Sequence, residues 1–212
     1  MSKLRFNITM SLDGFVAGPD QSEDDPLGVG GEQLHEWALP LAAFREPHGR
    51  EGGEVNASSA VIEETLENVG AAVMGRNMFG GGPGPWSGDW TGWWGDDPPF
   101  HYPVFVLTHH AREPLPMEGG TTFHFVTDGI ESALEQAKEA AGGKDVSLSG
   151  GASAAQQYLA AGLVDEMLIS VVPVFLRGGS RLFEGLGEGD IKLEQLRAID
   201  APGVTHITYR VG

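Results

Sequence analysis

Hydrophobic and polar residues alternate at the start of the chain and then change to a helical spacing. Residues 4–12, LRFNITMSL, alternate roughly and predict a strand, because successive side chains of a strand point to opposite faces. The pair Asp13-Gly14 predicts a turn directly after this strand. An apolar stripe at helical spacing then predicts a helix over residues 31–45. The stripe consists of Leu34, Trp37, Ala38 and Leu41.

The middle of the chain repeats this change between helical stripes and short apolar runs. A stripe between residues 61 and 69 predicts a helix that Gly70 caps, and the run 71–74 follows as a buried strand. Similar stripes predict helices that begin at residues 130 and 152. Further strands are expected at 104–108, 122–126, 146–149 and 165–176, and an antiparallel pair at 191–200 and 204–211.

This order of elements predicts an α/β fold: a central, mostly parallel sheet with an antiparallel C-terminal edge and flanking helices. The 212 residues suit one domain, 1–212, with a Trp/Gly-rich loop at 80–103. Pro173 interrupts the strand 165–176 and indicates a sheet edge or a bulge. An edge strand there would allow pairing with a second subunit.

The composition excludes several classes of function. With 13 Lys and Arg against 30 Asp and Glu, the net charge is −17, which disfavours nucleic acid and anionic membranes as partners. The absence of cysteine excludes disulfides, thiolate metal sites and a cysteine nucleophile. The first residues lack the apolar core of a signal peptide, and the longest apolar run, 167–176, is too short for a membrane span. We therefore expect a cytoplasmic protein without a metal site.

Two glycines follow the strand at 146–149 and precede a helix. One interpretation of Gly150-Gly151 is a plain tight turn. The other is a phosphate site, because a helix N-terminus presents free N–H groups and glycine lets a ligand approach the backbone. Ser149 and Ser153 would add hydroxyl donors to such a site.

Two further strand ends favour the phosphate interpretation. Gly75 and Arg76 follow the strand at 71–74, and a guanidinium suits a phosphate monoester such as the 2′-phosphate of NADPH. Thr108 ends the strand at 104–108. Since the carboxyl ends of parallel strands meet at one edge of the sheet, the three ends predict a nucleotide lying across that edge.

The chain carries SLDG, MGR, VLT, LSGGA and VVPVFLRGGSRLF in this order. In this it resembles the dihydrofolate-reductase-like superfamily and, within it, the C-terminal reductase domain of the bifunctional riboflavin-biosynthesis deaminase/reductase. The resemblance covers nearly the whole chain. It implies a dihydrofolate-reductase-like fold, NADPH as cofactor, hydride transfer to a small heterocyclic or sugar-like substrate, and a homodimer. The implied activity is like that of 5-amino-6-(5-phosphoribosylamino)uracil reductase or of dihydrofolate reductase.

The resemblance also implies roles for single residues. Positions after the second and third strands would hold the adenosine phosphates, the Gly-Gly turn the pyrophosphate, positions near the N-terminus the nicotinamide, and a later loop would close the site. With the neighbouring polar residues, the expected cofactor-binding set is Thr9, Val16, Ala17, Gly75, Arg76, Asn77, Thr108, Ser149, Gly150, Gly151, Ala152, Ser153, Leu176, Gly178 and Gly179.

The chain departs from the family pattern at two places. His109 and His110 follow Thr108, where relatives often carry a basic residue, so the preference for NADPH over NADH stays open. Glu32 and Glu36 lie on the first predicted helix without the motif of a folate-protonating acid. Asp13 is the candidate catalytic residue, as a proton relay or substrate contact, although Asp-Gly is also an ordinary turn pair.

Tryptophans are the candidate substrate contacts. The loop 80–103 holds four of them, which are expected either to wall a pocket or to cover the core or a subunit contact. We name Trp37, Trp86 and Trp94 as candidates, with Trp37 also suited to the core. Two other functions stay open: a nucleotide-binding module without catalysis, and a reductase of a xenobiotic or secondary metabolite.

Overall fold

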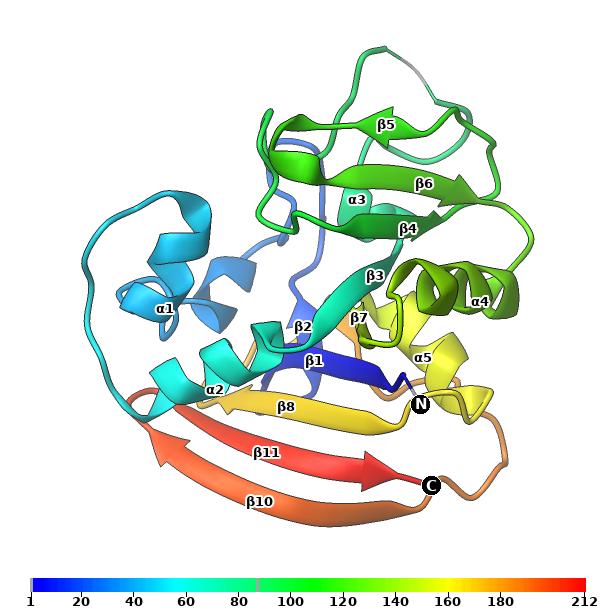
Figure 1. Ribbon diagram of the computed structural model, residues 1–212. Helices are drawn as coiled ribbons and strands as arrows, with labels where there is room; N and C mark the ends of the chain where they lie inside the picture. The colour runs from blue at the N-terminus through cyan, green and yellow to red at the C-terminus, as the bar shows by residue number, and fades with distance from the viewer. Residues whose placement is uncertain (1, 87) are drawn as a thin grey trace.

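The computed structural model describes residues 2–86 and 88–212. Its main feature is a nine-stranded sheet with the order β10-β11-β8-β1-β7-β3-β4-β6-β5, and β2 and β9 form a small second sheet (Figure 1). The strands are β1 Leu4–Ser11, β2 Phe15–Ala17, β3 Val69–Gly75, β4 Pro103–Leu107, β5 Leu115–Pro116, β6 Thr122–Val126, β7 Asp145–Leu148, β8 Glu166–Val172, β9 Ser180–Arg181, β10 Leu193–Ala201 and β11 Val204–Val211. The helices are α1 Ala42–Arg45, α2 Ala57–Leu66, α3 Arg76–Phe79, α4 Ile130–Ala140 and α5 Ala152–Ala160, with 3-10 turns at Gly31–Leu34, Glu46–His48 and Glu118–Gly120.

The centre of the sheet is parallel and its two sides end in antiparallel strands. β1 pairs in parallel with β7 and β8, and β3 with β7 and β4. The C-terminal hairpin of β10 and β11 adds to β8 in antiparallel orientation, and β5 adds to β6 at the other side. The predicted fold class, with its mostly parallel sheet and antiparallel C-terminal edge, is confirmed.

The two faces of the sheet differ in chemistry. Leu4 and Phe6 of β1 are buried on one face, in the same apolar cluster as residues of α4 and α5. Arg5 points to the other face, where its guanidinium donates to main-chain carbonyls at the C-terminal end of α2, including that of Glu67. Because side chains alternate along a strand, Asn7 and Thr9 lie on this second face as well.

The predicted helix over 31–45 is wrong. A 3-10 turn covers Gly31–Leu34, turns follow, and α1 begins only at Ala42. Pro40 lacks an N–H donor, so a continuous helix would lose a hydrogen bond and clash with the preceding turn. The apolar stripe is nevertheless buried, because successive turns present it to the same side. Leu34, Ala38 and Leu41 are each at most 3% exposed.

The second helix is displaced from its expected range. α2 begins earlier, because the Asn56 side chain accepts a hydrogen bond from the N–H of Ser58, and Ser59 reciprocates to the N–H of Asn56. Gly70 does not cap it, since the helix ends at Leu66 and Gly70 lies within β3. A Cβ on Gly70 would stand 2.5 Å from the carbonyl oxygen of Ala141, so close packing explains this glycine.

The expectation of a sheet edge at Pro173 is also wrong. β8 lies between β1 and β11, and it ends at Val172, so Pro173 follows the strand instead of interrupting it. The chain stays beside β1 for a short distance, because the N–H of Leu12 donates to the carbonyl of Val174 at 3.0 Å. The outer strand on this side is β10.

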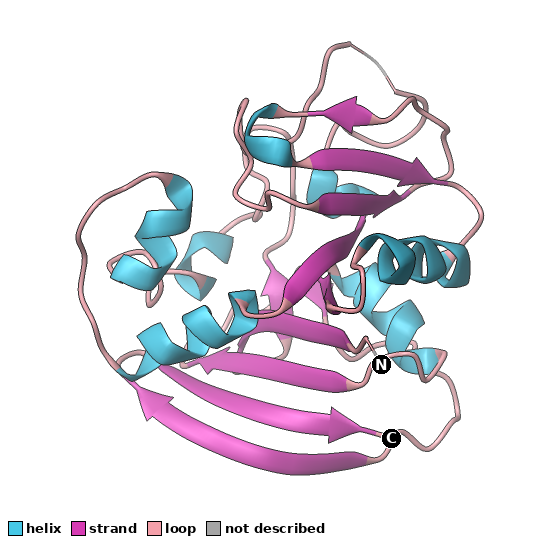
Figure 2. Cartoon of the chain, viewed as in Figure 1, coloured by secondary structure: helices cyan, strands magenta, loops and turns pink. Residues whose placement is uncertain are grey.

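The tryptophan-rich segment covers one side of the sheet. Figure 2 shows most of the chain between α3 and β4 as loop. Trp86, Trp90 and Trp94 pack against a buried cluster that includes Phe79 of α3 and Phe123 of β6. Of the helices in the described residues, none has the length and apolar character to cross a membrane.

Candidate functional site

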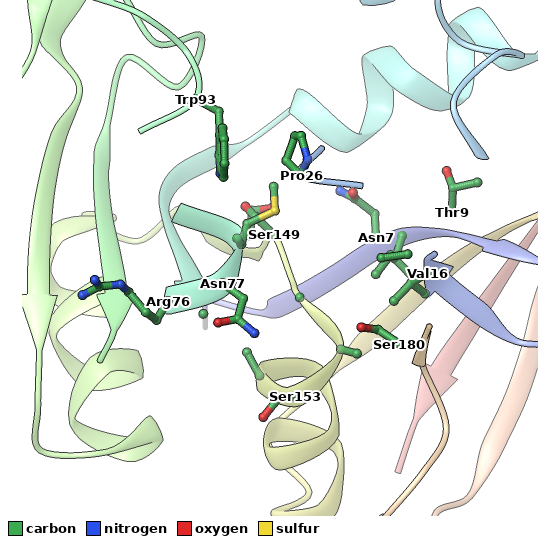
Figure 3. A pocket seen from close by; sticks show the side chains of 18 of the residues that line it. Asn7, Thr9, Val16, Pro26, Arg76, Asn77, Trp93, Ser149, Ser153 and Ser180 are labelled. Carbon is green, nitrogen blue, oxygen red and sulfur yellow. The ribbon is translucent and has the colours of Figure 1, made fainter. Parts of the chain in front are cut away.

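A cavity of about 1120 Å³ opens at the carboxyl ends of the parallel strands and extends over the second face of the sheet. This exceeds the usual 300–1,000 Å³ or so of sites for one small ligand, so it has room for two. Figure 3 shows Arg76 at one end and Thr9 and Val16 toward the other, with Ser149 and Ser153 between them. The arrangement suits an elongated ligand with a second molecule beside one end.

Glycines bring two strand ends together in the middle of this cavity. The N–H of Gly75 donates to the carbonyl of Gly150 at 2.7 Å, and the N–H of Ser149 donates to Val73 at 2.9 Å. Gly150 has a φ of 106°, which side chains rarely adopt, so glycine is required there. The turn interpretation and the ligand interpretation of the two glycines are therefore compatible: the turn joins β7 to α5 and to the end of β3.

Gly151 leaves open space where a side chain would be. A Cβ built on Gly151 has no neighbour within 4 Å, and its φ of −73° is ordinary, so neither a close neighbour nor a positive φ requires glycine. Gly151 is the N-cap of α5 without a side-chain cap, and it lines the cavity together with Ala152 and Ser153. Uncapped N–H groups at a helix start attract anions. This cradle fits a phosphate.

Arg76 has buried donors without a partner. One Nη donates to the carbonyls of Gly81 and Gly82, both at 3.0 Å, while Nε and the other Nη are buried and unpaired. The guanidinium stacks on Trp86, and Arg112 lies 5.0 Å from the centre of the same ring. Burial and the charge of Arg112 lower the pKa of Arg76 from its ordinary value. An anion placed here would relieve both effects.

The end of β4 is held by its own hydrogen bonds. The N–H of His110 donates to the Thr108 hydroxyl at 3.1 Å, and Trp86 Nε1 donates to the His110 carbonyl at 2.7 Å. Thr108, His109 and His110 line the cavity beside Arg76 and Asn77. The two histidines thus lie in the half of the cavity that also holds the Arg76 guanidinium with its two unpaired donors.

The opposite end is formed by β1, β2 and the segment before β9. Thr9, Val16, Ala17 and Gly179 line the cavity there. Gly179 has a φ of 108°, and a Cβ on it would stand 2.1 Å from the carbonyl oxygen of Ala17, so this glycine lets the two segments touch. The lining residues do not include Leu176 and Gly178, nor Gly150 in the turn after β7. Leu176 packs in a separate apolar cluster with Leu34 and Val172.

Asp13 lies outside the lining residues and anchors a loop. Its carboxylate accepts hydrogen bonds from the Ser11 hydroxyl and from the N–H groups of Leu176 and Arg177, at 2.7, 3.1 and 2.8 Å. Removal from solvent alone would raise its pKa, but these donors hold the pKa of Asp13 below its ordinary value. An acid that stays ionised at neutral pH is a poor proton donor.

The tryptophan candidates separate into two groups. Trp37 and Trp94 line the cavity, and so does Trp93, which sequence reasoning did not select. Trp86 packs edge-on against Phe79 and Phe125 and carries Arg76 on its face. Its place is beneath the guanidinium, where it positions Arg76.

Sequence reasoning missed a fourth strand end and the floor of the cavity. Thr127, Gly129 and Ile130, which follow β6, line the cavity at the start of α4. The available signal was the sequence Thr127-Asp128-Gly129 directly after the predicted strand 122–126. By strand register, Ser147 lies opposite Arg5, and Ser170 opposite Thr9, which places both on the second face of the sheet.

A buried histidine lies next to this floor. His206 Nδ1 is 2.8 Å from the Ser170 hydroxyl, and Nε2 is 2.8 Å from the Ser58 hydroxyl. Trp37 packs edge-on against the ring, with centroids 4.9 Å apart. Burial, helped by the charge of Arg197, lowers the pKa of His206 to about 4. The imidazole is neutral near pH 7 and fixes the hydroxyl of Ser170.

Comparisons with known proteins identify the family and the fold of the chain. The family model described as RibD C-terminal domain matches residues 2–204. A Shewanella sp. PV-4 structure, titled as a riboflavin biosynthesis protein, is 24% identical with a TM-score of 0.63, covering 100% of this chain and 99% of that one. None of the curated proteins matches the chain.

Two more distant structures share the fold. Dihydrofolate reductase of Enterococcus faecalis, solved with NADP(H), is 12% identical with a TM-score of 0.51, and 99% of this chain and 96% of that chain are covered. The deaminase/5-amino-6-(5-phosphoribosylamino)uracil reductase of Thermotoga maritima is 11% identical with a TM-score of 0.57. It covers this chain fully, whereas only 57% of its own length is matched.

Proposed function

Because the chain belongs to the RibD C-terminal domain family, we propose that it is an NADPH-dependent reductase acting on a small heterocyclic or sugar-like substrate. The reductase-like family supports the reaction class. The finer statements, NADPH and the substrate, rest on the cavity.

The observation that carries the proposal is a phosphate cradle and, in the same cavity, the Arg76 guanidinium with two unpaired donors. The cradle at Gly151 and the start of α5 offers N–H groups without a side-chain cap, and a Cβ built on Gly151 would have no neighbour within 4 Å. Arg76 offers two buried donors without partners. A pyrophosphate and a 2′-phosphate are the groups that these two places would hold in NADPH.

The remaining residues orient and shield the reacting partners. A reduced nicotinamide supplies hydride when bound, so the chain itself needs little beyond position and electrostatics. Thr9, Val16 and Ala17 would bound the nicotinamide end. Trp93 and Trp94 line the cavity from the loop side, where they would shield the reacting centre from water.

Two titratable side chains that line the cavity, His35 and Tyr102, are uncharged near neutral pH. Burial lowers the pKa of His35, so this imidazole is uncharged, and burial raises the pKa of Tyr102 to about 12, so the phenol stays protonated. Glu184 is the one carboxylic acid among the described residues that line the cavity. Solvent or the substrate therefore supplies the proton in our proposal.

This scarcity of acids also favours a second candidate, a nucleotide-binding module without turnover. The two functions differ in one measurable property. NADPH binding is common to both, whereas oxidation of NADPH in the presence of pterins, flavin precursors or quinones occurs only in the first.

We also propose a homodimer, with a small molecule as the ligand and neither nucleic acid nor a membrane as partner. The net charge of −17 supports the exclusion of polyanions. The outer strand β10 carries Leu193 and Leu196 at 50% and 40% exposure, which favours it as a subunit contact. Light scattering after gel filtration of the native chain and of Leu196→Lys tests this assembly.

The experiment that tests the cofactor is a titration with NADPH and NADH, followed by quenching of tryptophan fluorescence. We expect Arg76→Ala to weaken NADPH binding about 10- to 100-fold, the range for charge-assisted hydrogen bonds, and NADH binding less than threefold. Arg50→Ala removes the same charge from an exposed position and serves as the control.

The comparison between the two nucleotides separates the role of Arg76 from a structural one. Loss of the bonds to Gly81 and Gly82 would disturb both nucleotides alike. Equal weakening of NADPH and NADH would therefore remove the 2′-phosphate role, and no binding of NADPH by the native protein would refute the proposed function.

A further inference from the structure

The half of the cavity beneath α1 and α2 has apolar, ring-bearing walls. Phe44 of α1 and Ile62 of α2 line it from one side, and Trp93 and Tyr102 from the other. α2 lies over β1, because Arg5 of that strand donates to the carbonyls of Glu64, Thr65 and Glu67. Aromatic and aliphatic walls of this kind favour a flat ring that stacks between them.

The floor of the same half is polar but uncharged. Asn7, Thr9, Ser147 and Ser170 lie on one face of β1, β7 and β8 and line the cavity. Figure 3 shows Asn7 and Thr9 along β1. The hydroxyl of Ser170 is fixed by neutral His206. These amide and hydroxyl groups can donate to and accept from the polar edge of a ring, without compensating a full charge.

Permanent positive charge is confined to other parts of the cavity. Among the described lining residues, only Arg76 and Arg181 carry it. Arg76 lies at the end of β3, and Arg181 is held over Phe15, 4.5 Å from its ring centre, at β2. The arginines nearest the ring-bearing walls are occupied elsewhere. Arg5 binds the end of α2, and Arg45 donates to the carbonyls of Glu51 and Gly52.

From this separation we propose that the substrate half takes an uncharged, planar ring compound and rejects a substrate that carries a phosphate. The name substrate rests on the proposed function; the ligand class rests on the walls, floor and charges alone. An anion buried here would lack a cation or a full set of donors, which is costly. The amide and hydroxyl groups of the floor then form hydrogen bonds with the polar edge of the ring.

The test compares two probes that share one ring system. 1,4-Naphthoquinone is flat and uncharged, and its 2-sulfonate adds a single permanent anion. Since the chain has no cysteine, the quinone cannot form a thiol adduct. Binding to the native protein is measured without NADPH by quenching of tryptophan fluorescence, because Trp37, Trp93 and Trp94 line the cavity.

We expect the uncharged probe to bind at least tenfold more tightly than the sulfonate. The measurement is repeated in 0.5 M salt, where the Debye length is only about 4 Å, because the net charge of the chain repels every anion at long range. Discrimination that persists in high salt arises in the cavity. Equal binding, or tighter binding of the sulfonate, would overturn the proposal.

A designed cation provides the second arm. Thr65 is half-buried on α2 and lines the cavity, whereas Ala60 on the same helix is exposed and does not. Thr65→Lys should strengthen sulfonate binding about tenfold and change naphthoquinone binding less than threefold. Ala60→Lys adds the same charge and should leave the ratio of the two affinities unchanged.

The outcomes separate this inference from the proposed function. Failure of NADPH to bind would refute the reductase and leave the probe ratio as a property of the cavity. Normal NADPH binding with no preference for the uncharged probe would refute the ligand class alone. If Thr65→Lys and Ala60→Lys shift sulfonate binding equally, the ring-bearing walls are not the binding place and the inference fails.

Discussion

The two halves of the cavity are built from different parts of the chain. In the half that we propose to hold the cofactor, called the cofactor half, main-chain groups and glycines at adjacent strand ends form much of the surface, as at Gly75 and Gly151. In the substrate half, side chains from α1, α2, the tryptophan loop and the middle of the sheet converge, as Phe44, Trp93 and Ser170 do. The first half is fixed by the fold. The shape and polarity of the second half depend on which side chains stand at the positions that line it.

This difference predicts how each half responds to mutation. A backbone cradle has no side chain to remove, so it is damaged by adding atoms. A wall of side chains tolerates exchange and changes its preference instead. Relatives with the same fold can therefore keep the cradle while differing in the ligand that they accept.

The largest effect is expected from adding bulk to the cradle. Gly151→Val places a branched side chain in the space where a Cβ has no neighbour within 4 Å, and the ordinary φ of this residue lets the backbone accept it. We expect NADPH affinity to fall more than 100-fold while the far-UV circular dichroism stays unchanged.

Gly189→Val is the matched control for this change. Gly189 also has an ordinary φ and no neighbour within 4 Å of a built Cβ, but it does not line the cavity. Its NADPH affinity should equal that of the native protein. If folded Gly151→Val binds NADPH with native affinity, the cofactor lies elsewhere. The assignment of the two halves to cofactor and substrate would then be wrong.

The cofactor half could be predicted from sequence because its signals are local. A strand, one or two glycines and a helix start occupy consecutive residues, as at 146–153, and parallel strands must bring such ends to one edge. The same rule placed Gly75 and Thr108 beside them. The fold class followed from the same alternation of elements.

The substrate half could not be predicted, because its residues meet only through tertiary structure. Ser170 lines the floor through strand register, and His206 lies beside it from a strand that is distant in sequence. The packing of Trp86 beneath Arg76 also depends on neighbours that no short window contains. The break of the helix near Pro40, by contrast, has a local cause that the sequence carries.

The second prediction concerns the buried imidazole under the substrate half. His206 has a pKa of about 4 in the folded protein against an ordinary value of 6.5, mainly because burial penalises its charged form. Between these values the unfolded chain binds more protons, so the folded state loses stability as the pH falls from 6.5 to 4. The gap corresponds to about 3 kcal/mol.

His206→Gln should remove this pH-dependent contribution, because the amide keeps hydrogen-bonding groups but does not titrate. Urea unfolding of the native protein and the variant at pH 7, 5.5 and 4 measures the difference between the two slopes. His109→Gln, at an exposed position, is the control and should keep the native slope. If the stability of the native protein and of His206→Gln changes with pH in parallel, the imidazole is accessible to protons. The inference that an uncharged His206 supports the floor would then fail.

The smallest effect is expected at Asp13, the residue at the end of β1 that sequence reasoning assigned to catalysis. Its carboxylate is occupied by Ser11 and by two N–H groups of the loop that contains Leu176 and Arg177, and its lowered pKa keeps it ionised. Asp13→Asn retains one acceptor oxygen. We expect kcat/KM to change less than threefold, with an unchanged pH profile, and the loop to become more sensitive to proteolysis. A loss of 100-fold or more lies in the range for a general acid. It would make Asp13 part of the reacting centre and would place the chemistry at the end of β1 instead of in the substrate half of the cavity.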